Sequence, residues 1–255
     1  MRLMKRILSA AAVLALSASL LVGCSSGTAS SVPVSASSAA ESTVSSVEET
    51  ASSAVDENEA AAAQLLNDLT GSYQELWPVI LADEYKQTWL DDCTALVGED
   101  NAEAAFEKLS SMVTGDVYGE DAVKAYANGG GAYFCGFTNS LAILTFDGET
   151  STISGTDKDG NVLFSHTYHY IGMEPVHGLY EFESDDADSG EFTYFFLAPD
   201  TSAETYHIEF RYGSDADALS QYDAGDYAYW VASGISTDCD QTMIDNCIEL
   251  FCTEN

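Results

Sequence analysis

The sequence predicts a mostly β domain with flanking helices, built around an antiparallel β-barrel or a strongly curved sheet. Aromatic segments with alternating polarity follow one another, and Asp-Gly or Ser-Gly pairs between them are typical of tight hairpin turns. Helical spacing of apolar residues precedes these segments and returns near the C-terminal end. Sequential hairpins favour a meander, and six or more strands over roughly 80 residues suffice to close a barrel.

Six strands are expected from this alternation, over residues 132–137, 141–146, 162–171, 179–182, 192–197 and 205–212. The turns between them are expected at Asp147-Gly148, Asp159-Gly160 and Ser189-Gly190. Helices are expected where apolar residues recur three or four positions apart, and Gly129-Gly130-Gly131 ends the first helical group. The residues that mark these helices are Leu65, Leu66, Leu69; Tyr85, Trp89, Cys93, Leu96; Phe106, Leu109, Val113; and Met243, Ile244, Cys247, Ile248, Phe251.

Residues 1–24 have the three parts of a bacterial lipoprotein signal peptide. Positive charges at Arg2, Lys5 and Arg6 precede an apolar run, and small residues lead to Cys24. We expect Cys24 to be lipidated and to anchor the protein to a membrane. Residues 25–58 are rich in Ser and Ala and lack aromatic residues, which indicates a disordered tether. The remaining residues, 59–255, are expected to fold as the metal-binding domain argued for below.

The chain is strongly acidic. Three of its eight basic residues belong to the signal peptide, so 42 acidic residues face only five basic ones once the signal is removed. Such a surface repels phosphate, so neither nucleic acid nor electrostatic docking on anionic lipid is expected. The lipid on Cys24 would be the only membrane contact. Cations are the natural counter-charge.

Five cysteines remain after Cys24, namely Cys93, Cys135, Cys239, Cys247 and Cys252. Their number is odd, so at least one is free or ligates something, and the sequence does not choose among the possible disulfides. The helical stripes of Cys93 and Cys247 favour buried thiols that pack as small apolar groups.

His207 and Glu209 are the residues that best match a metal site. Alternation along the strand expected over residues 205–212 puts both on one face, about 7 Å apart at the backbone. Imidazole and carboxylate both bind zinc, so the two side chains could converge on one ion. A solvated polar face with Arg211 paired to Glu209 explains the same pattern.

Several short segments carry a family resemblance that spans most of the chain after Leu69. They are LTGSYQELWP (69–78), TYHYIG (167–172), FE (182–183), SG (189–190), FTYF (192–195), RYG (211–213) and SGIS (233–236). Their order and content resemble the ZinT/YodA family of zinc-binding proteins, which also occurs as the C-terminal domain of some Gram-positive zinc-uptake lipoproteins. The resemblance implies a lipocalin-like (calycin) antiparallel β-barrel with N-terminal helices and a C-terminal helix.

The resemblance also implies a metal site at one end of the barrel. That family binds zinc through a His before a strand and a His-x-His pair on it. Here the pair falls on His207 and Glu209, and the upstream position falls on Asp200, or on Ala198 with another gap placement. The implied metal ligands are therefore Asp200, His207 and Glu209. The fourth is left open among Asp238, Cys239, Asp240 and water.

The ligand types set the expected metal. Carboxylates in place of imidazoles harden a site and favour manganese, calcium or weaker zinc binding, whereas a Cys239 thiolate would favour zinc. Of the other histidines, His166 is expected to be packed and hydrogen-bonded, and His169 and His177 to be exposed, with His177 a possible substitute ligand. Residues 185–191 indicate an acidic hairpin turn, since their glycine is misplaced for an EF-hand.

The function expected from these observations is that of an extracytoplasmic lipoprotein on the cell membrane, a monomer that binds a divalent metal. Zinc is the first choice, for scavenging or for delivery to a metal ABC importer. The alternative is a lipocalin-like cell-surface module that binds a small apolar ligand or a protein partner and has a degraded metal site. An enzyme is not expected, because no nucleophile with an oriented base is recognisable.

Overall fold

The structure is a computed structural model that describes residues 57–254, and from Glu59 onward these residues form one compact unit. The signal peptide predicted over residues 1–24, with its lipidated Cys24, lies outside the described residues. So does the tether predicted over residues 25–58, except for its last two residues, which begin a helix that covers residues 57–68. These expectations stay predictions.

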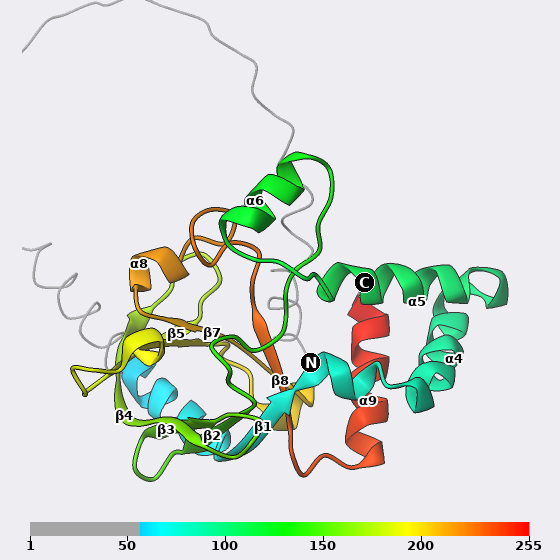
Figure 1. The fold of residues 1–255 in the computed structure, drawn as a ribbon. Helices are drawn as coiled ribbons and strands as arrows, with labels where there is room; N and C mark the ends of the chain where they lie inside the picture. Colours follow the sequence, from blue (N-terminus) through cyan, green and yellow to red (C-terminus); the bar gives the residue numbers. More distant parts are fainter. Residues whose placement is uncertain (1–56, 255) are drawn as a thin grey trace, which may run out of the picture. The chain divides into compact units, whose positions relative to one another are not determined.

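Eight antiparallel strands close into a barrel (Figure 1). Each strand pairs with the next in the chain, and β8 returns to pair with β1, so the sheet has no free edge. This up-and-down closure is the lipocalin-like architecture that the sequence predicts. The strands are β1 (Gly71–Glu75), β2 (Ile143–Asp147), β3 (Thr152–Thr156), β4 (Val162–Met173), β5 (Tyr180–Ser184), β6 (Tyr194–Leu197), β7 (Ile208–Gly213) and β8 (Ala232–Ser236).

The turn between β3 and β4 shows how local residues set the hairpins. The Asp157 carboxylate accepts hydrogen bonds from the backbone N–H groups of Asp159 and Asn161, at 2.9 and 2.8 Å. Gly160 has a positive φ of 80°, which glycine adopts without a steric penalty. The hairpin turn predicted at Asp159-Gly160 is therefore present.

The prediction of a strand over residues 132–137 is wrong. Within this segment only Phe134 forms bridges, one to Thr114 and one to Trp230. The chain then turns at Asn139 and Ser140, whose φ angles of 55° and 63° are left-handed. The segment instead makes backbone hydrogen bonds, through Phe134 and Cys135, to residues 229–233 at the start of β8, and the Phe137 ring packs on Phe210 of the interior, 5.4 Å between centroids.

Three barrel strands, β1, β3 and β8, were not predicted from alternation. Glycine obscures the pattern in two of them. A Cβ at Gly155 in β3 would lie 2.4 Å from the Phe164 ring, and one at Gly234 in β8 would lie 3.1 Å from the Ile208 side chain. Both glycines therefore make room for a large residue on the neighbouring strand. β1 was missed for another reason: helices α3 to α6 separate it from β2 in the sequence, so it does not stand next to another strand in the chain.

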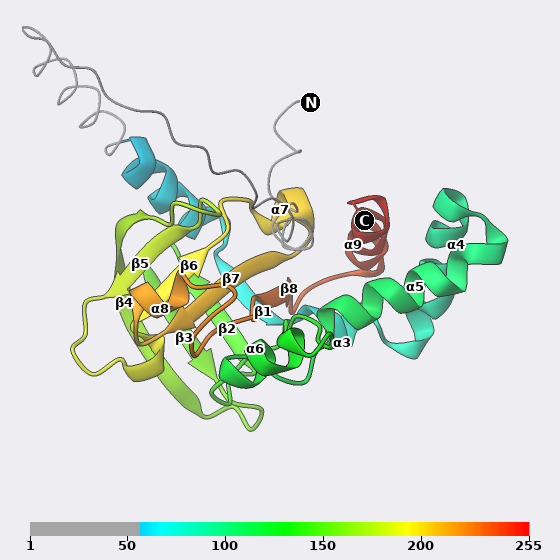
Figure 2. The same ribbon diagram turned by 90° about the horizontal axis from the view of Figure 1, so that it is seen from above.

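Helices flank the barrel, and α9 lies between the barrel and α4 in both ribbon views (Figures 1 and 2). They are α3 (Leu76–Ile80), α4 (Lys86–Val97), α5 (Glu99–Val113), α6 (Glu120–Ala127), α7 (Ser202–Thr205), α8 (Ala216–Leu219) and α9 (Gln241–Glu254), with short 3-10 helices η1 (Asp83–Tyr85) and η2 (Gly190–Phe192). The helices expected around residues 85–96, 106–113 and 243–251 are present as α4, α5 and α9. Within residues 57–254, no helix combines the length and the apolar character that crossing a bilayer requires.

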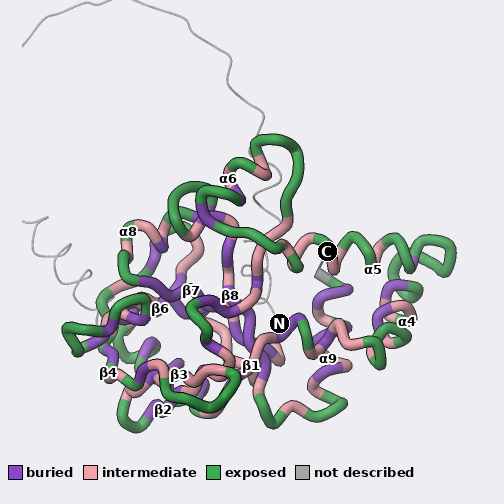
Figure 3. Tube along the Cα trace, in the orientation of Figure 1, coloured by how far each residue is buried: buried purple, intermediate pink, exposed green. Residues whose placement is uncertain are grey.

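The interior of the barrel is filled by its own aromatic rings. Phe195 on β6 is fully buried, and its ring centroid lies 5.4 Å from those of Tyr168 and Tyr212. Phe192 closes the stack, 4.0 Å from Phe164. The burial-coloured trace shows buried residues along the barrel strands and again along α9 and α4 (Figure 3). An apolar ligand inside the barrel would have to displace these rings.

Removal of the central ring tests this packing. We expect Phe195→Ala to lower the free energy of unfolding by about 3–5 kcal/mol, because it leaves a cavity among rings that cannot collapse into it. Val162→Ala is the matched control, since Val162 is 70% exposed and should change stability by less than about 0.5 kcal/mol. Urea unfolding of both variants measures the difference. Equal stabilities would contradict a packed interior.

Candidate metal centre

His207 lies at the entrance to β7 and not within the strand predicted over residues 205–212. Ser202–Thr205 forms the short helix α7, and Tyr206 ends it with a left-handed φ of 66°. The strand begins one residue after His207, at Ile208. The left-handed conformation of Tyr206 turns the chain, so that the carbonyl oxygen of Thr205 lies 2.7 Å from Nδ1 of His207.

The imidazole of His207 is enclosed between β7 and α9, with only 3% of its side chain exposed. Its ring centroid lies 4.9 Å from that of Phe251 on α9. Cys247, one turn earlier on α9, is within hydrogen-bonding reach of the imidazole. Nε2 lies 3.8 Å from Oε1 of Glu209, whose side chain is 29% exposed. His207 and Glu209 therefore face each other, as the sequence pattern predicts.

The charge state of His207 is set by these neighbours. Burial lowers its pKa, but hydrogen bonds and electrostatic interactions with Cys247 and Glu209 outweigh burial and raise the pKa to about 10. Since a carbonyl oxygen can only accept, Nδ1 must donate its proton to Thr205. Nε2 is therefore the nitrogen that can exchange its proton for a metal.

Asp200 lies in the same neighbourhood, between α7 and β6. Its Oδ1 atom is buried and has no hydrogen-bond partner. Burial raises the pKa of the carboxyl group and Glu209 raises it further, whereas a hydrogen bond from its own backbone N–H and the charge of His207 lower it. Ala198, the other upstream position that the resemblance allowed, cannot ligate through its side chain, and its N–H bonds the Glu209 carbonyl at 2.9 Å.

Of the three candidates for a fourth ligand, Asp240 has a structural role. Its carboxylate accepts from the N–H of Met243 at 2.9 Å and so caps the start of α9. Burial raises the pKa of the Cys239 thiol, a hydrogen bond with its own backbone lowers it, and the nearby Asp240, Cys247 and Asp238 raise it further. The cysteine that contacts His207 is Cys247, which sequence reasoning assigned to packing. Its position four residues before Phe251 predicts that Cys247 faces the core but does not predict its contact with His207.

The side chains of Asp200, His207, Glu209 and Cys247 are neighbours, but they do not point at one common position. Among the described residues, no three His, Cys, Asp or Glu side chains are placed to hold a metal ion together. The pair of His207 and Glu209 comes nearest. Two ligand atoms bound tetrahedrally at roughly 2.0–2.1 Å from zinc lie about 3.4 Å apart, so the 3.8 Å between Nε2 and Oε1 needs only a small closure.

Arg211 does not use Glu209 as its partner. Its guanidinium donates to the backbone carbonyls of Leu219 and Tyr227 and lies over the Tyr222 ring, 4.1 Å from the centroid. The simple Arg211–Glu209 pair considered from the sequence is therefore not formed. Arg211 instead holds the segment 214–230 against the outer face of β7, and the Glu209 carboxylate remains free to face His207.

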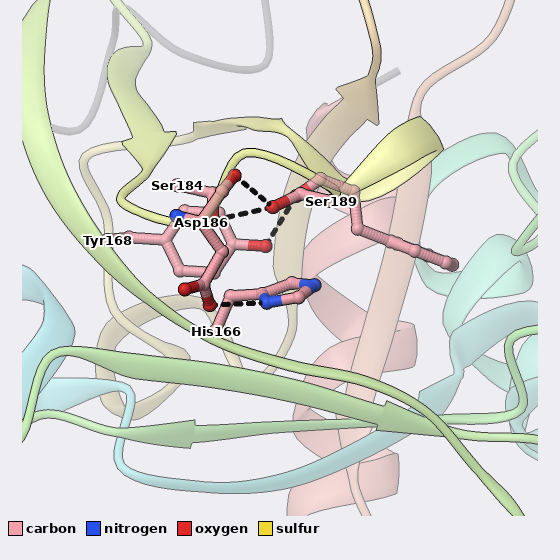
Figure 4. A network of polar contacts seen from close by, with 6 residues as sticks. His166, Tyr168, Ser184, Asp186 and Ser189 are labelled. Carbon is pink, nitrogen blue, oxygen red and sulfur yellow. Dashed lines mark hydrogen bonds and ion pairs between the residues drawn. The ribbon is translucent and has the colours of Figure 1, made fainter.

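The other histidines are engaged elsewhere. His166 Nδ1 lies 2.7 Å from Oδ2 of Asp186, and His169 Nδ1 lies 2.8 Å from Oδ1 of Asp185. Figure 4 shows the His166–Asp186 pair beside the hydroxyl groups of Ser184 and Ser189, which bond each other at 2.7 Å and close the acidic turn. His166 is thus packed and hydrogen-bonded as expected, and His169 is exposed as expected.

His177 is not exposed, contrary to the prediction. Only 16% of its side chain is accessible, and its ring contacts that of Tyr222 at a tilt of 40°, with centroids 3.7 Å apart. Its Nδ1 lies 3.3 Å from Oε2 of the fully buried Glu174. Tyr222 is thus held between His177 and Arg211. The contacts found for His177 are with Glu174 and Tyr222, so the geometry does not favour it as a substitute ligand.

The solved structures that are similar to this chain include two from Streptococcus pneumoniae. The Zn(II)-bound ZinT-like domain of Streptococcus pneumoniae AdcA is 15% identical with a TM-score of 0.46, covering 72% of this chain and 89% of that domain. Zn(II)-bound AdcA from the same organism is 14% identical with a TM-score of 0.43, covering 71% of this chain and 34% of AdcA. No family model matches, and no curated protein matches significantly. The name of the first structure contains the family name that the sequence segments suggested, and membership of this chain in that family stays a prediction.

The role of Arg211 gives a stability prediction. We expect Arg211→Lys to lower the free energy of unfolding by roughly 2–4 kcal/mol, because an ammonium cannot satisfy both carbonyls and stack on Tyr222 as well. Lys124→Gln is the control, since Lys124 makes only exposed contacts with Glu120 and Asp121. Urea unfolding measures the stability of both variants. A loss of stability no larger than in the control would rule out this role of Arg211.

Proposed function

We propose that this protein binds a divalent cation, with zinc preferred, through Asp200, His207 and Glu209. The observation that carries the proposal is the buried, unpartnered Oδ1 of Asp200 next to the facing pair of His207 and Glu209. A buried carboxylate oxygen without a partner is costly, and a cation would satisfy it. The residues present therefore fit a cation.

The tautomer of His207 supports the same proposal. Histidines that bind metals commonly donate the other ring N–H to a carbonyl or carboxylate, which fixes the ring and its basicity. Nδ1 of His207 makes this contact with Thr205. A metal at Nε2 would displace the proton that the raised pKa holds there, and a rotation of the Asp200 side chain would complete the ligand set.

The thiol of Cys247 bears on the choice of metal. Two carboxylates and one imidazole alone would suit manganese or calcium as well as zinc. A thiolate is a soft ligand that shifts preference towards zinc, and Cys247 lies against the same imidazole. We therefore propose Cys247 as the fourth ligand in place of Asp238, Cys239 or Asp240. The zinc-bound state of both AdcA structures agrees with this metal.

The cellular role is proposed from the N-terminal sequence. A lipidated Cys24 and a polar tether over residues 25–58 would hold the domain at the outer face of the cell membrane, where it would scavenge metal or pass it to an importer. The acidic surface would raise the local concentration of cations. We rank the alternative, an apolar ligand inside the barrel, second, because the interior rings already contact one another.

Metal titration tests the site. Full-length protein purified without a His-tag and stripped of metal is titrated with zinc by calorimetry against a competing chelator. We expect the wild type to bind one zinc ion per chain. In the double variant His207→Ala, Glu209→Ala, the affinity for zinc should fall by more than the roughly 10–100-fold that follows loss of a residue that only supports a ligand. Unchanged affinity in the double variant would exclude this site.

Two further variants sharpen the titration. His169→Gln is the matched control, because His169 is an exposed histidine that also contacts a carboxylate, and it should bind zinc as the wild type does. Cys247→Ser should weaken zinc binding much more than manganese binding, since only zinc gains from the softer ligand. Equal losses for both metals would remove Cys247 from the ligand set.

Cell fractionation tests the anchor. In cells that express the full chain, we expect the wild type in the membrane fraction and Cys24→Ser released from it or retained as the unprocessed precursor, because serine cannot form the thioether to lipid. Detergent extraction and immunoblotting with an antibody to the folded domain measure the distribution. A Cys24→Ser chain that is still processed and bound to the membrane would refute lipidation at this residue.

A further inference from the structure

We propose that Cys93 and Cys252 are a modification site, two buried thiols that form an intramolecular disulfide between α4 and α9. The inference does not depend on the proposed metal site.

The geometry singles out this pair. The two Sγ atoms lie 3.7 Å apart, and the residues are 2% and 4% exposed. A disulfide bond is about 2.05 Å long, so each sulfur has to move by less than about 1 Å along the line that joins them. The two residues are far apart in the sequence and meet only because α9 packs on α4.

The three other described cysteines have different neighbours. Cys135 lies with Ser233, Trp77 and Glu209, and Cys247 lies against His207. Cys239 has Cys247 in its surroundings but makes no direct thiol contact with it. The single sulfur-to-sulfur contact within residues 57–254 is therefore the one between α4 and α9, which resolves the pairing that the sequence left open.

The chemistry also indicates when the bond forms. Thiol–disulfide exchange needs an accessible thiolate, but burial and the neighbouring Cys93 raise the pKa of Cys252. The bond should therefore form during folding, before α9 covers Cys93. Oxidation joins the two sulfurs and releases two protons and two electrons. The electrons reduce a disulfide-bearing oxidant, oxidised glutathione or an oxidised dithiol protein, to two thiols.

The bond would fix the helix that encloses His207. α9 carries Cys247 and Phe251 against the imidazole, and Cys252 follows directly after Phe251. A covalent link to α4 at this point would hold the last turns of the helix in place. Because the link closes a loop of more than 150 residues, it should also strongly restrict the unfolded chain.

Peptide mapping tests the pairing. The full chain is unfolded with dithiothreitol in urea, refolded in a mixture of reduced and oxidised glutathione, alkylated with iodoacetamide under denaturing conditions and cleaved after Glu without reduction. Cleavage yields residues 85–99 and 250–254, each with one cysteine. We expect these two fragments to be joined, at about 2 Da below the sum of their thiol masses.

The other outcomes overturn the proposal. Recovery of both fragments as alkylated thiols would exclude the bond, and so would linkage of residues 250–254 to the fragment that carries Cys239 and Cys247, or to the one with Cys24. Cys247→Ser is the matched control on the same helix and should keep the link, whereas Cys93→Ser should lose it.

Thermal unfolding gives a readout that needs no variant. The oxidised wild type should melt on the order of 10 °C above the same protein reduced in denaturant and refolded with dithiothreitol. Cys93→Ser should show no difference between the two conditions. A wild type whose melting temperature is the same in both would refute a disulfide that links the two helices.

Discussion

Strand β7 is covered on both faces, and most of what distinguishes this barrel follows from that constraint. Its inner residues Ile208, Phe210 and Tyr212 join the aromatic interior, while its outer residue Arg211 is equally buried. Polar groups that lose water must find partners within the protein. Arg211 finds two backbone carbonyls and an aromatic face, and His207 finds Thr205 and Glu209. One carboxylate oxygen of Asp200 has no hydrogen-bond partner, and this unsatisfied oxygen is the basis of the proposed cation site.

Much of the fold could be predicted because hairpin turns and helix periodicity are local signals. The Asp157 to Asn161 turn and the helices α4, α5 and α9 depend on residues that lie close together in the sequence. The strands that were missed depend on distant partners. Gly155 and Gly234 look like strand breakers until Phe164 and Ile208 are seen opposite them. Residues 132–137 show the converse, since they alternate as a strand does but form only isolated bridges, at Phe134, and hydrogen bonds to residues 229–233.

The candidate site was predictable only where its residues are neighbours in sequence. His207 and Glu209 could be paired by spacing, although the left-handed Tyr206 places His207 before the strand and not on it. Asp200 required the family resemblance. Neither sequence spacing nor the family resemblance predicted Cys247, because helical spacing shows that a residue faces the core but not which side chain it contacts there. The partners of Arg211 could not be predicted for the same reason. They are the backbone carbonyls of Leu219 and Tyr227, and any residue type has a backbone carbonyl.

Closure of the barrel joins the first strand to the last. β1 pairs with β8 through Gln74 and Ile235, with more than 150 residues between them, and no earlier segment replaces β8. Contacts of such long range make folding slow, and a ribosome must deliver nearly the whole chain before the ring can shut. Until then the edge of β1 that will meet β8 has unpaired backbone groups, to which a strand from another chain can add.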